Sequence, residues 1–204
     1  MIDVRLFISV FVTLFVIMDP PGTVPIFLAL TRSMPRARRV RAAWQALAVS
    51  FGVVVGFALF GQQLLTYLHV SLPALQAAGG LLLLLVAMQL LTGKEQGGVP
   101  DDVAPGGNVA MVPLGTPLLA GPGAIVATMV FVHQASNAGQ WIALALGILL
   151  VHACLYVAMR FATAVHRVLG DSGTLLVSRI AGLLLAAIAA QMLADAILTF
   201  ARQV

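Results

Sequence analysis

Six apolar segments constrain the fold of this chain more than any other feature. They cover about residues 4–33, 44–68, 74–92, 109–133, 140–159 and 177–200, and proline and glycine interrupt the first and the fourth. A helix that crosses a bilayer needs about 20 apolar residues, and the four uninterrupted segments meet that length. Among its 204 residues 61% are hydrophobic and only 9% are charged, a balance that no ordinary soluble domain has. The sequence therefore predicts one all-α integral membrane domain over residues 1–204.

Charge and cysteine content argue against several other functions. The formal net charge is +4, but the basic residues cluster at the ends of apolar segments without aromatic stacking positions, so no nucleic-acid partner is expected. Cys154 is the single cysteine and lies inside an apolar segment, which leaves neither a disulfide framework nor a thiolate metal site. Arg5 precedes an apolar stretch that no small-residue cleavage site follows, so we expect an uncleaved first membrane segment.

The distribution of arginine and lysine predicts the orientation of the domain. If all six segments cross, the Arg-rich loop 32–41, Lys94 and the arginines around the fifth connection lie on one side. The positive-inside rule makes that side cytoplasmic and places both termini outside, in a cell (inner) membrane. A rival topology, in which segments one and four are re-entrant hairpins, stays open because it also leaves most basic residues inside.

The two halves of the chain resemble each other. The stretch GLLLLLVAMQLL begins at Gly80 and GLLLAAIAAQML at Gly182, and Pro21-Gly22 has a partner in Pro122-Gly123. Two three-segment repeats are therefore predicted, over about residues 1–95 and 105–204. They are inverted if each crosses three times and parallel if the interrupted segments are re-entrant. Inverted repeats with paired broken segments point to a secondary transporter whose site lies near the midplane.

The interrupted segments predict broken helices with exposed backbone groups. Pro20 and Pro21 have no N–H, so the first helix should end near Ile17 or Met18 and a second should run from Gly22 to about residue 33. Half-helix N-termini can hold a carboxylate, and the carbonyls before them can hold an ammonium or a sodium ion. With no deep lysine, arginine or carboxylate cluster, a small neutral zwitterion fits best. The alternative is a purely structural kink.

Asp19 and two glutamines are the polar candidates within the segments. A deep carboxylate is costly, which suits reversible protonation or sodium binding, but Asp19 could equally cap the helix that follows it. Gln89 and Gln191 occupy equivalent repeat positions and can bond across the bundle or to substrate. Thr23 and Thr116 are candidate pocket hydroxyls. Position 120 holds alanine where the first repeat has Asp19, so a coupling charge would belong to one repeat only.

The motifs DPPGTVPIFLALT, PLGTPLLAGPGAI and AGLLLAAIAAQ resemble the MarC family of six-span membrane proteins over essentially the whole chain. The resemblance implies a transporter of small neutral, glycine- or alanine-like amino acids that is driven by a proton or sodium gradient, with no other cofactor. The family often has asparagine where Asp19 stands. Carried over by motif, the candidate site positions are Asp19, Pro20, Gly22, Thr23, Pro25, Thr116, Pro117, Gly121, Pro122 and Gly123, to which Gln89 and Gln191 are added.

The sequence leaves two other functions open. An exporter of other small metabolites or drugs would use the same site, and a non-transporting membrane assembly protein would need only the Gly-rich helix faces. An intramembrane enzyme is not expected, because aspartyl chemistry needs two facing carboxylates and the segments offer one deep aspartate. The expected partners are the amino acid, the lipid bilayer and further copies of the chain in a homo-oligomer.

Overall fold

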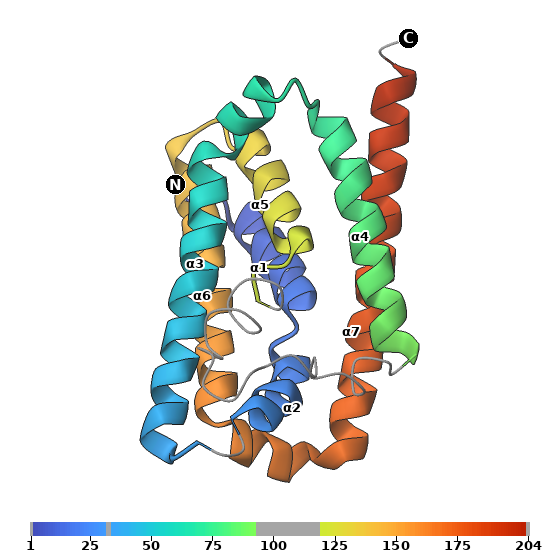
Figure 1. Cartoon of the computed structure of the whole chain (residues 1–204). Helices are drawn as coiled ribbons and strands as arrows, with labels where there is room; N and C mark the ends of the chain where they lie inside the picture. The colour runs from blue at the N-terminus through green and yellow to red at the C-terminus, as the bar shows by residue number, and fades with distance from the viewer. Residues whose placement is uncertain (1, 32–33, 93–118, 203–204) are drawn as a thin grey trace.

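The structure, a computed structural model, describes residues 2–31, 34–92 and 119–202. These residues form helices and no strand (Figure 1). The helices are α1 (Val4–Met18), α2 (Pro20–Leu30), α3 (Arg36–Tyr67), α4 (Leu72–Thr92), α5 (Pro122–Gln134), α6 (Ala138–Arg160) and α7 (Ala162–Ala201). Five spans are long and apolar enough to cross a membrane, and α5 is a shorter apolar helix. The predicted all-α membrane class is confirmed.

The first apolar segment is broken where its prolines predict. Helix α1 ends at Met18 and α2 begins at Pro20, and together they form one candidate span of 27 residues. In Figure 1 α2 continues from α1 toward the far end of the bundle, so the two helices of segment one do not form a hairpin, and the full crossing stays a prediction. Helix α2 ends at Leu30, somewhat before the predicted residue 33. Of the fourth segment the structure describes the break and α5, while residues 109–118 lie outside the described part.

Two helices are longer than their apolar runs. Helix α3 begins at Arg36 and not near residue 44, because arginine is a good helix former and the basic turns can project from the bilayer. Helix α7 begins at Ala162, well before residue 177, but Gly170 divides it at φ 63° and ψ −176°. The part before Gly170 runs across the end of the bundle, and the part after it forms the last span (Figure 1).

The bundle contains two packed units. The larger core joins α1, α2, α3, α5 and α6 around fully buried side chains such as Val24, Phe27 and Leu155. The smaller core lies between α4 and α7, and Leu83, Ala87, Leu185 and Ala189 form most of it. Helix α4 packs against α7 more extensively than any other two described helices pack.

The contacts between α4 and α7 match in pairs. A Cβ atom on Gly80 would lie 3.0 Å from the carbonyl oxygen of Ala189, and one on Gly182 would lie 3.2 Å from that of Ala87. Gly80 and Ala87 occupy the same places in the first half as Gly182 and Ala189 in the second. The two helices run in opposite directions, as do α3 and α6 (Figure 1). The inverted repeat stays a prediction, and these observations agree with it.

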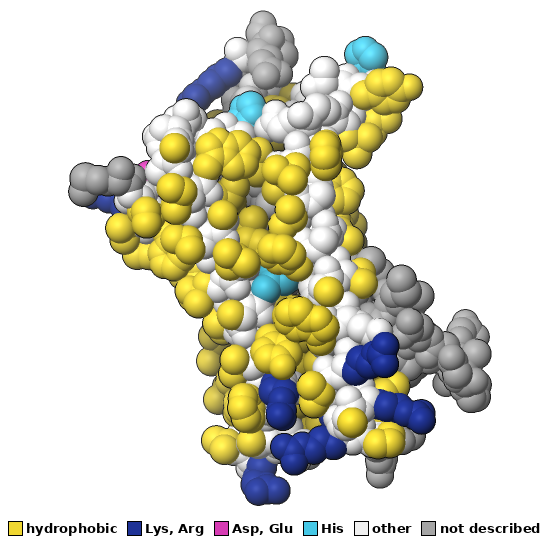
Figure 2. All heavy atoms as spheres, turned by 90° about the vertical axis from the view of Figure 1, so that its left-hand side faces the viewer, with side chains coloured by type: hydrophobic (Ala, Val, Ile, Leu, Met, Phe, Trp, Pro, Cys, Tyr) yellow, Lys and Arg dark blue, Asp and Glu magenta, His cyan; other side chains and the backbone are white. Residues whose placement is uncertain are grey.

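The outer surface of the bundle suits lipid. Many large side chains are exposed on the spans, among them Leu85 on α4, Leu149 on α6 and Leu183 on α7. Figure 2 shows apolar side chains over the upper and middle parts of one face and most of its basic side chains at the lower end. An exposed apolar belt above a basic end is the pattern of a protein whose solvent is the bilayer.

Candidate functional site

The α1–α2 junction consists of a single residue, Asp19. Its backbone is left-handed, at φ 39° and ψ 69°, a conformation that aspartate and asparagine tolerate better than most side chains. Asp19 ends α1 through a bond from its N–H to the Phe15 carbonyl (3.0 Å) and caps α2 by accepting from the Gly22 N–H at Oδ1 (3.1 Å). The side chain is buried, with 9% of its surface exposed. Asp19 therefore caps the helix that follows it, which is one of the two roles that the sequence left open.

Thr23 adds a second set of bonds at the same junction. Its N–H and its hydroxyl both donate to the carbonyl oxygen of Asp19, each at 2.9 Å, and the hydroxyl also lies 3.4 Å from the Met18 carbonyl. Pro20 and Pro21 have no N–H to donate. The first turn of α2 therefore directs all its N–H groups, those of Gly22 and Thr23, to Asp19.

This first turn faces α7 through Gly22. A Cβ atom there would overlap Oδ2 of Asp19, would lie 2.8 Å from its Cγ, and would come within 3.1 Å of the Ser178 hydroxyl oxygen. The carboxylate thus lies directly over a glycine and beside α7, where a larger residue could not be placed without moving it.

The second break also starts a helix at proline and glycine, but its N-cap is extended and not left-handed, and it has no carboxylate. Leu119 and Ala120 are buried before it, and Gly121 is the N-cap of α5 at φ −60° and ψ 163°. The Gly121 carbonyl accepts from the N–H groups of Ala124 (3.0 Å) and Ile125 (3.3 Å). Gly121 has no side chain to cap the helix, so the N–H of Gly123 is not directed to a side-chain cap as the N–H of Gly22 is.

The two breaks lie beside each other. A Cβ atom on Gly123 would overlap Cδ2 of Leu83 and would lie 3.4 Å from Cγ2 of Ile17, which belongs to the last turn of α1. The end of α1 and the start of α5 are therefore in contact, as the sequence predicts for the two interruptions. Both breaks also face the α4–α7 pair, the first at Ser178 and the second at Leu83.

The remaining candidates fall into three groups. Pro20 and Thr23 are buried at the first break, and Pro25 lies half-buried within α2. Pro122 is exposed at the start of α5, while Thr116 and Pro117 lie outside the described residues. Gln89 and Gln191 are both exposed on their helices, and Gln191 donates to Oδ1 of Asp195 at 2.8 Å. The structure does not bring the two glutamines to the break.

Sequence reasoning missed Ser178 and Leu83, the two side chains through which α7 and α4 meet the breaks. A usable signal existed for Ser178, because it precedes Gly182 by four residues and so lies on the same face of a helix. Leu83 gave none, since it is one of five consecutive leucines. Among the described residues, no group of three or more His, Cys, Asp or Glu could hold a metal ion.

Comparisons with known proteins cover nearly the whole chain. A family model described as "MarC family integral membrane protein" matches residues 4–201. The UPF0056 membrane protein MJ1677 of Methanocaldococcus jannaschii is 36% identical over 199 residues, which are 96% of this chain and 97% of that protein. The UPF0056 membrane protein YvbG of Bacillus subtilis is 31% identical over 192 residues, which are 91% of each chain. The UPF0056 inner membrane protein YhgN of Escherichia coli is also 31% identical, over 93% of this chain and 95% of that protein.

No solved structure matches the chain. The family model spans both breaks and both halves, and the relatives are similar over almost their full lengths. Together with the apolar helices, this similarity identifies the protein as a multi-pass integral membrane protein. The chain belongs to the MarC family of integral membrane proteins.

Proposed function

We propose that this protein is a secondary transporter of small neutral amino acids of the glycine or alanine type, driven by a proton or sodium gradient. The observation that carries the proposal is the meeting of two broken helices beside the α4–α7 pair. The start of α5 contacts the end of α1 through Gly123 and Ile17. Broken helices inside a membrane protein supply backbone charge without exposing irregular backbone to lipid.

We assign a role to each break from the asymmetry between them. At α2 the N–H groups of the first turn are directed to Asp19, so this helix start presents a carboxylate to the site. At α5 the N-cap is Gly121, which has no side chain, and among the described residues no acidic side chain caps this start, so its N-terminus attracts an anion. A zwitterion would place its carboxylate at the Gly123 end and its ammonium, or the coupling cation, at the Asp19 end.

The packing supports a small substrate. Gly22 and Gly123 are covered so closely that a Cβ atom on either would overlap a neighbouring side chain. In the described arrangement α7 lies close to Gly22 and α4 lies close to Gly123, so we expect access to these glycines to require α4 and α7 to move away from the larger core. The two separate cores support such a motion of one unit against the other. The inverted repeat, supported by the matched contacts of Gly80 and Gly182, would let the site open to either side in turn.

Transport by purified protein in proteoliposomes tests the proposal. Labelled glycine and alanine are offered with a proton gradient, a sodium gradient or neither, and uptake is expected with one of the two gradients. The change Asp19→Asn keeps a capping side chain but removes the charge, so it should abolish the dependence on the gradient. Asp195→Asn is the matched control, because Asp195 is exposed on α7 and its hydrogen bonds to described residues stay within that helix.

Two results would contradict the proposal in different ways. If neither amino acid accumulates under either gradient, the proposed substrate class is wrong, and an exporter of other metabolites or a membrane assembly protein is favoured instead. If Asp19→Asn still drives uptake with full gradient dependence, the transporter stands but its coupling group is elsewhere.

A further inference from the structure

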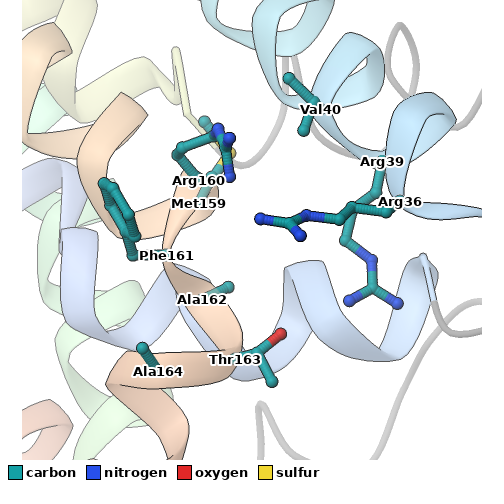
Figure 3. A pocket seen from close by; sticks show the side chains of 9 residues that line it. All are labelled: Arg36, Arg39, Val40, Met159, Arg160, Phe161, Ala162, Thr163 and Ala164. Carbon is teal, nitrogen blue, oxygen red and sulfur yellow. The ribbon is translucent and has the colours of Figure 1, made fainter.

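A basic pocket lies at the end of the bundle where α3 begins and α6 gives way to α7. Its volume is about 390 Å³, within the range of about 300–1,000 Å³ that small-molecule sites occupy. Arg36 and Arg39 line it from α3, and Arg160 lines it from the end of α6 (Figure 3). The buried side chains of Met159 and Ala162 belong to its wall.

The three arginines are short of anionic partners. Within the described residues none of them pairs with a carboxylate, and no Asp or Glu lines the pocket. Arg160 lies over the ring of Phe161, 5.6 Å from its centroid, and one terminal nitrogen of Arg39 donates to the Thr31 carbonyl at 3.3 Å. The Nε of Arg39 is buried and has no hydrogen-bond partner in the described part of the chain. A buried donor without a partner costs free energy.

Two helix starts add to the positive potential. Helix α3 begins at Arg36 and α7 begins at Ala162, and no side chain caps either start. Both residues line the pocket. The start of α3 therefore adds positive potential beside the three arginines, while the carbonyl end of α6 at Arg160 offsets part of the potential of the α7 start.

We propose that this pocket binds a phosphate group, in the form of a phosphate ester or an anionic phospholipid headgroup. Guanidinium groups match phosphate oxygens with paired, charge-assisted hydrogen bonds, and three of them suit a group with several acceptor oxygens. The pocket lies where the spans of α3 and α6 end, the depth at which the phosphates of a bilayer lie. It is separate from the breaks and does not depend on the proposed transport.

Binding to the full-length protein in neutral detergent tests the proposal. Isothermal titration is run with dioctanoyl phosphatidylglycerol, with the zwitterionic dioctanoyl phosphatidylcholine, and with inorganic phosphate. The double variant Arg36→Gln/Arg160→Gln removes two groups from opposite walls. The matched control is Arg38→Gln/Arg41→Gln, which removes the same charge from exposed positions of α3 that do not line the pocket.

We expect the affinity for phosphatidylglycerol or for inorganic phosphate to fall at least about tenfold in the pocket variant and to stay within about twofold in the control. Phosphatidylglycerol binding alone identifies a lipid site, and inorganic phosphate binding alone shows that the pocket takes a soluble phosphate group; either supports the proposal. Equal losses of affinity in both variants, or no binding of either anion to the unchanged protein, would overturn it.

If the pocket variant does not fold, Arg36→Lys/Arg160→Lys keeps the charge and should still weaken binding, because lysine lacks the planar guanidinium group of arginine. Unchanged affinity in that folded variant would also overturn the proposal.

Discussion

Asp19 offers the sharpest test of how the first break is held together. Two substitutions remove its charge: Asp19→Asn keeps a side-chain oxygen that can accept from the Gly22 N–H, and Asp19→Ala does not. Removing a carboxylate from the membrane interior can raise the free energy of unfolding, and any such gain is common to both variants. The difference in their free energies of unfolding therefore isolates the cap and the backbone.

The structure sets the size of that difference. Loss of an N-cap costs about 0.5–2 kcal/mol, typically about 1. Position 19 is left-handed at φ 39°, where alanine costs about 1–2 kcal/mol and asparagine is tolerated. Asp19→Ala should therefore be less stable than Asp19→Asn by about 2–3 kcal/mol. The hydroxyl of Thr23 bonds to the backbone carbonyl of residue 19 and is retained in both variants.

Equilibrium unfolding of the purified variants, in detergent with increasing sodium dodecyl sulfate, measures this difference. The matched pair Asp195→Ala and Asp195→Asn should differ by less, because Asp195 lies within α7 and caps no helix start. Equal stability of the alanine and asparagine variants at position 19 would show that the cap and the left-handed backbone do not hold the break. The role of Asp19 would then be sought in transport alone.

Three further predictions concern packing and protonation. Gly22→Ala should destabilise the protein by about 1–3 kcal/mol in the same unfolding assay. The control Gly52→Ala should be neutral or slightly stabilising, because nothing lies within 4 Å of its added Cβ. Equal effects of the two substitutions on stability would refute the close packing at the break. Gly80→Ala and Gly182→Ala should cost similar amounts, about 1–3 kcal/mol each, and a cost at one position only would contradict the matched packing of α4 and α7. The pKa of Asp3 is lowered by the backbone hydrogen bond that it accepts at the start of α1 and by an amide of α6. Because the folded-state pKa lies below the ordinary value of 3.8, the stabilisation by Asp3 is present above pH 3.8 and is lost as the pH falls from there through the lower folded-state pKa. The melting temperatures of wild type and Asp3→Ala should therefore converge only below the folded-state pKa.

The sequence predicted most of the membrane fold because lipid simplifies the problem. A run of apolar residues in a bilayer has to become a helix, and a Pro-Pro pair has to end one, so the six segments and the break after Met18 followed directly. Helix ends were predicted less well. The basic turns of α3 and the stretch before Gly170 in α7 are helical without being apolar, and hydropathy alone gives no signal for such turns.

The site was predictable only as far as backbone chemistry reaches. Proline and glycine marked both breaks, and the paired positions predicted that the breaks meet, but the contact of Ile17 with Gly123 is known only from the structure. The placement of Gln89 and Gln191 did not follow, because an apolar helix has no polar face to reveal which side faces the bundle. The arginine pocket was also missed, since the arginines were interpreted together as an orientation signal and not as side chains that converge on one space.

The matched contacts of Gly80 and Gly182 have a consequence for energetics. If the two halves exchange conformations during a transport cycle, identical halves would make the two end states equal in free energy, and the protein would rest in each for half of the time. Asp19 is one difference between the halves that removes this equality, because alanine stands at position 120 and the Asp19 cap has no equivalent there. A bias of about 1 kcal/mol from a single cap would populate one state about fivefold over the other. One carboxylate could thus set the resting direction of the molecule.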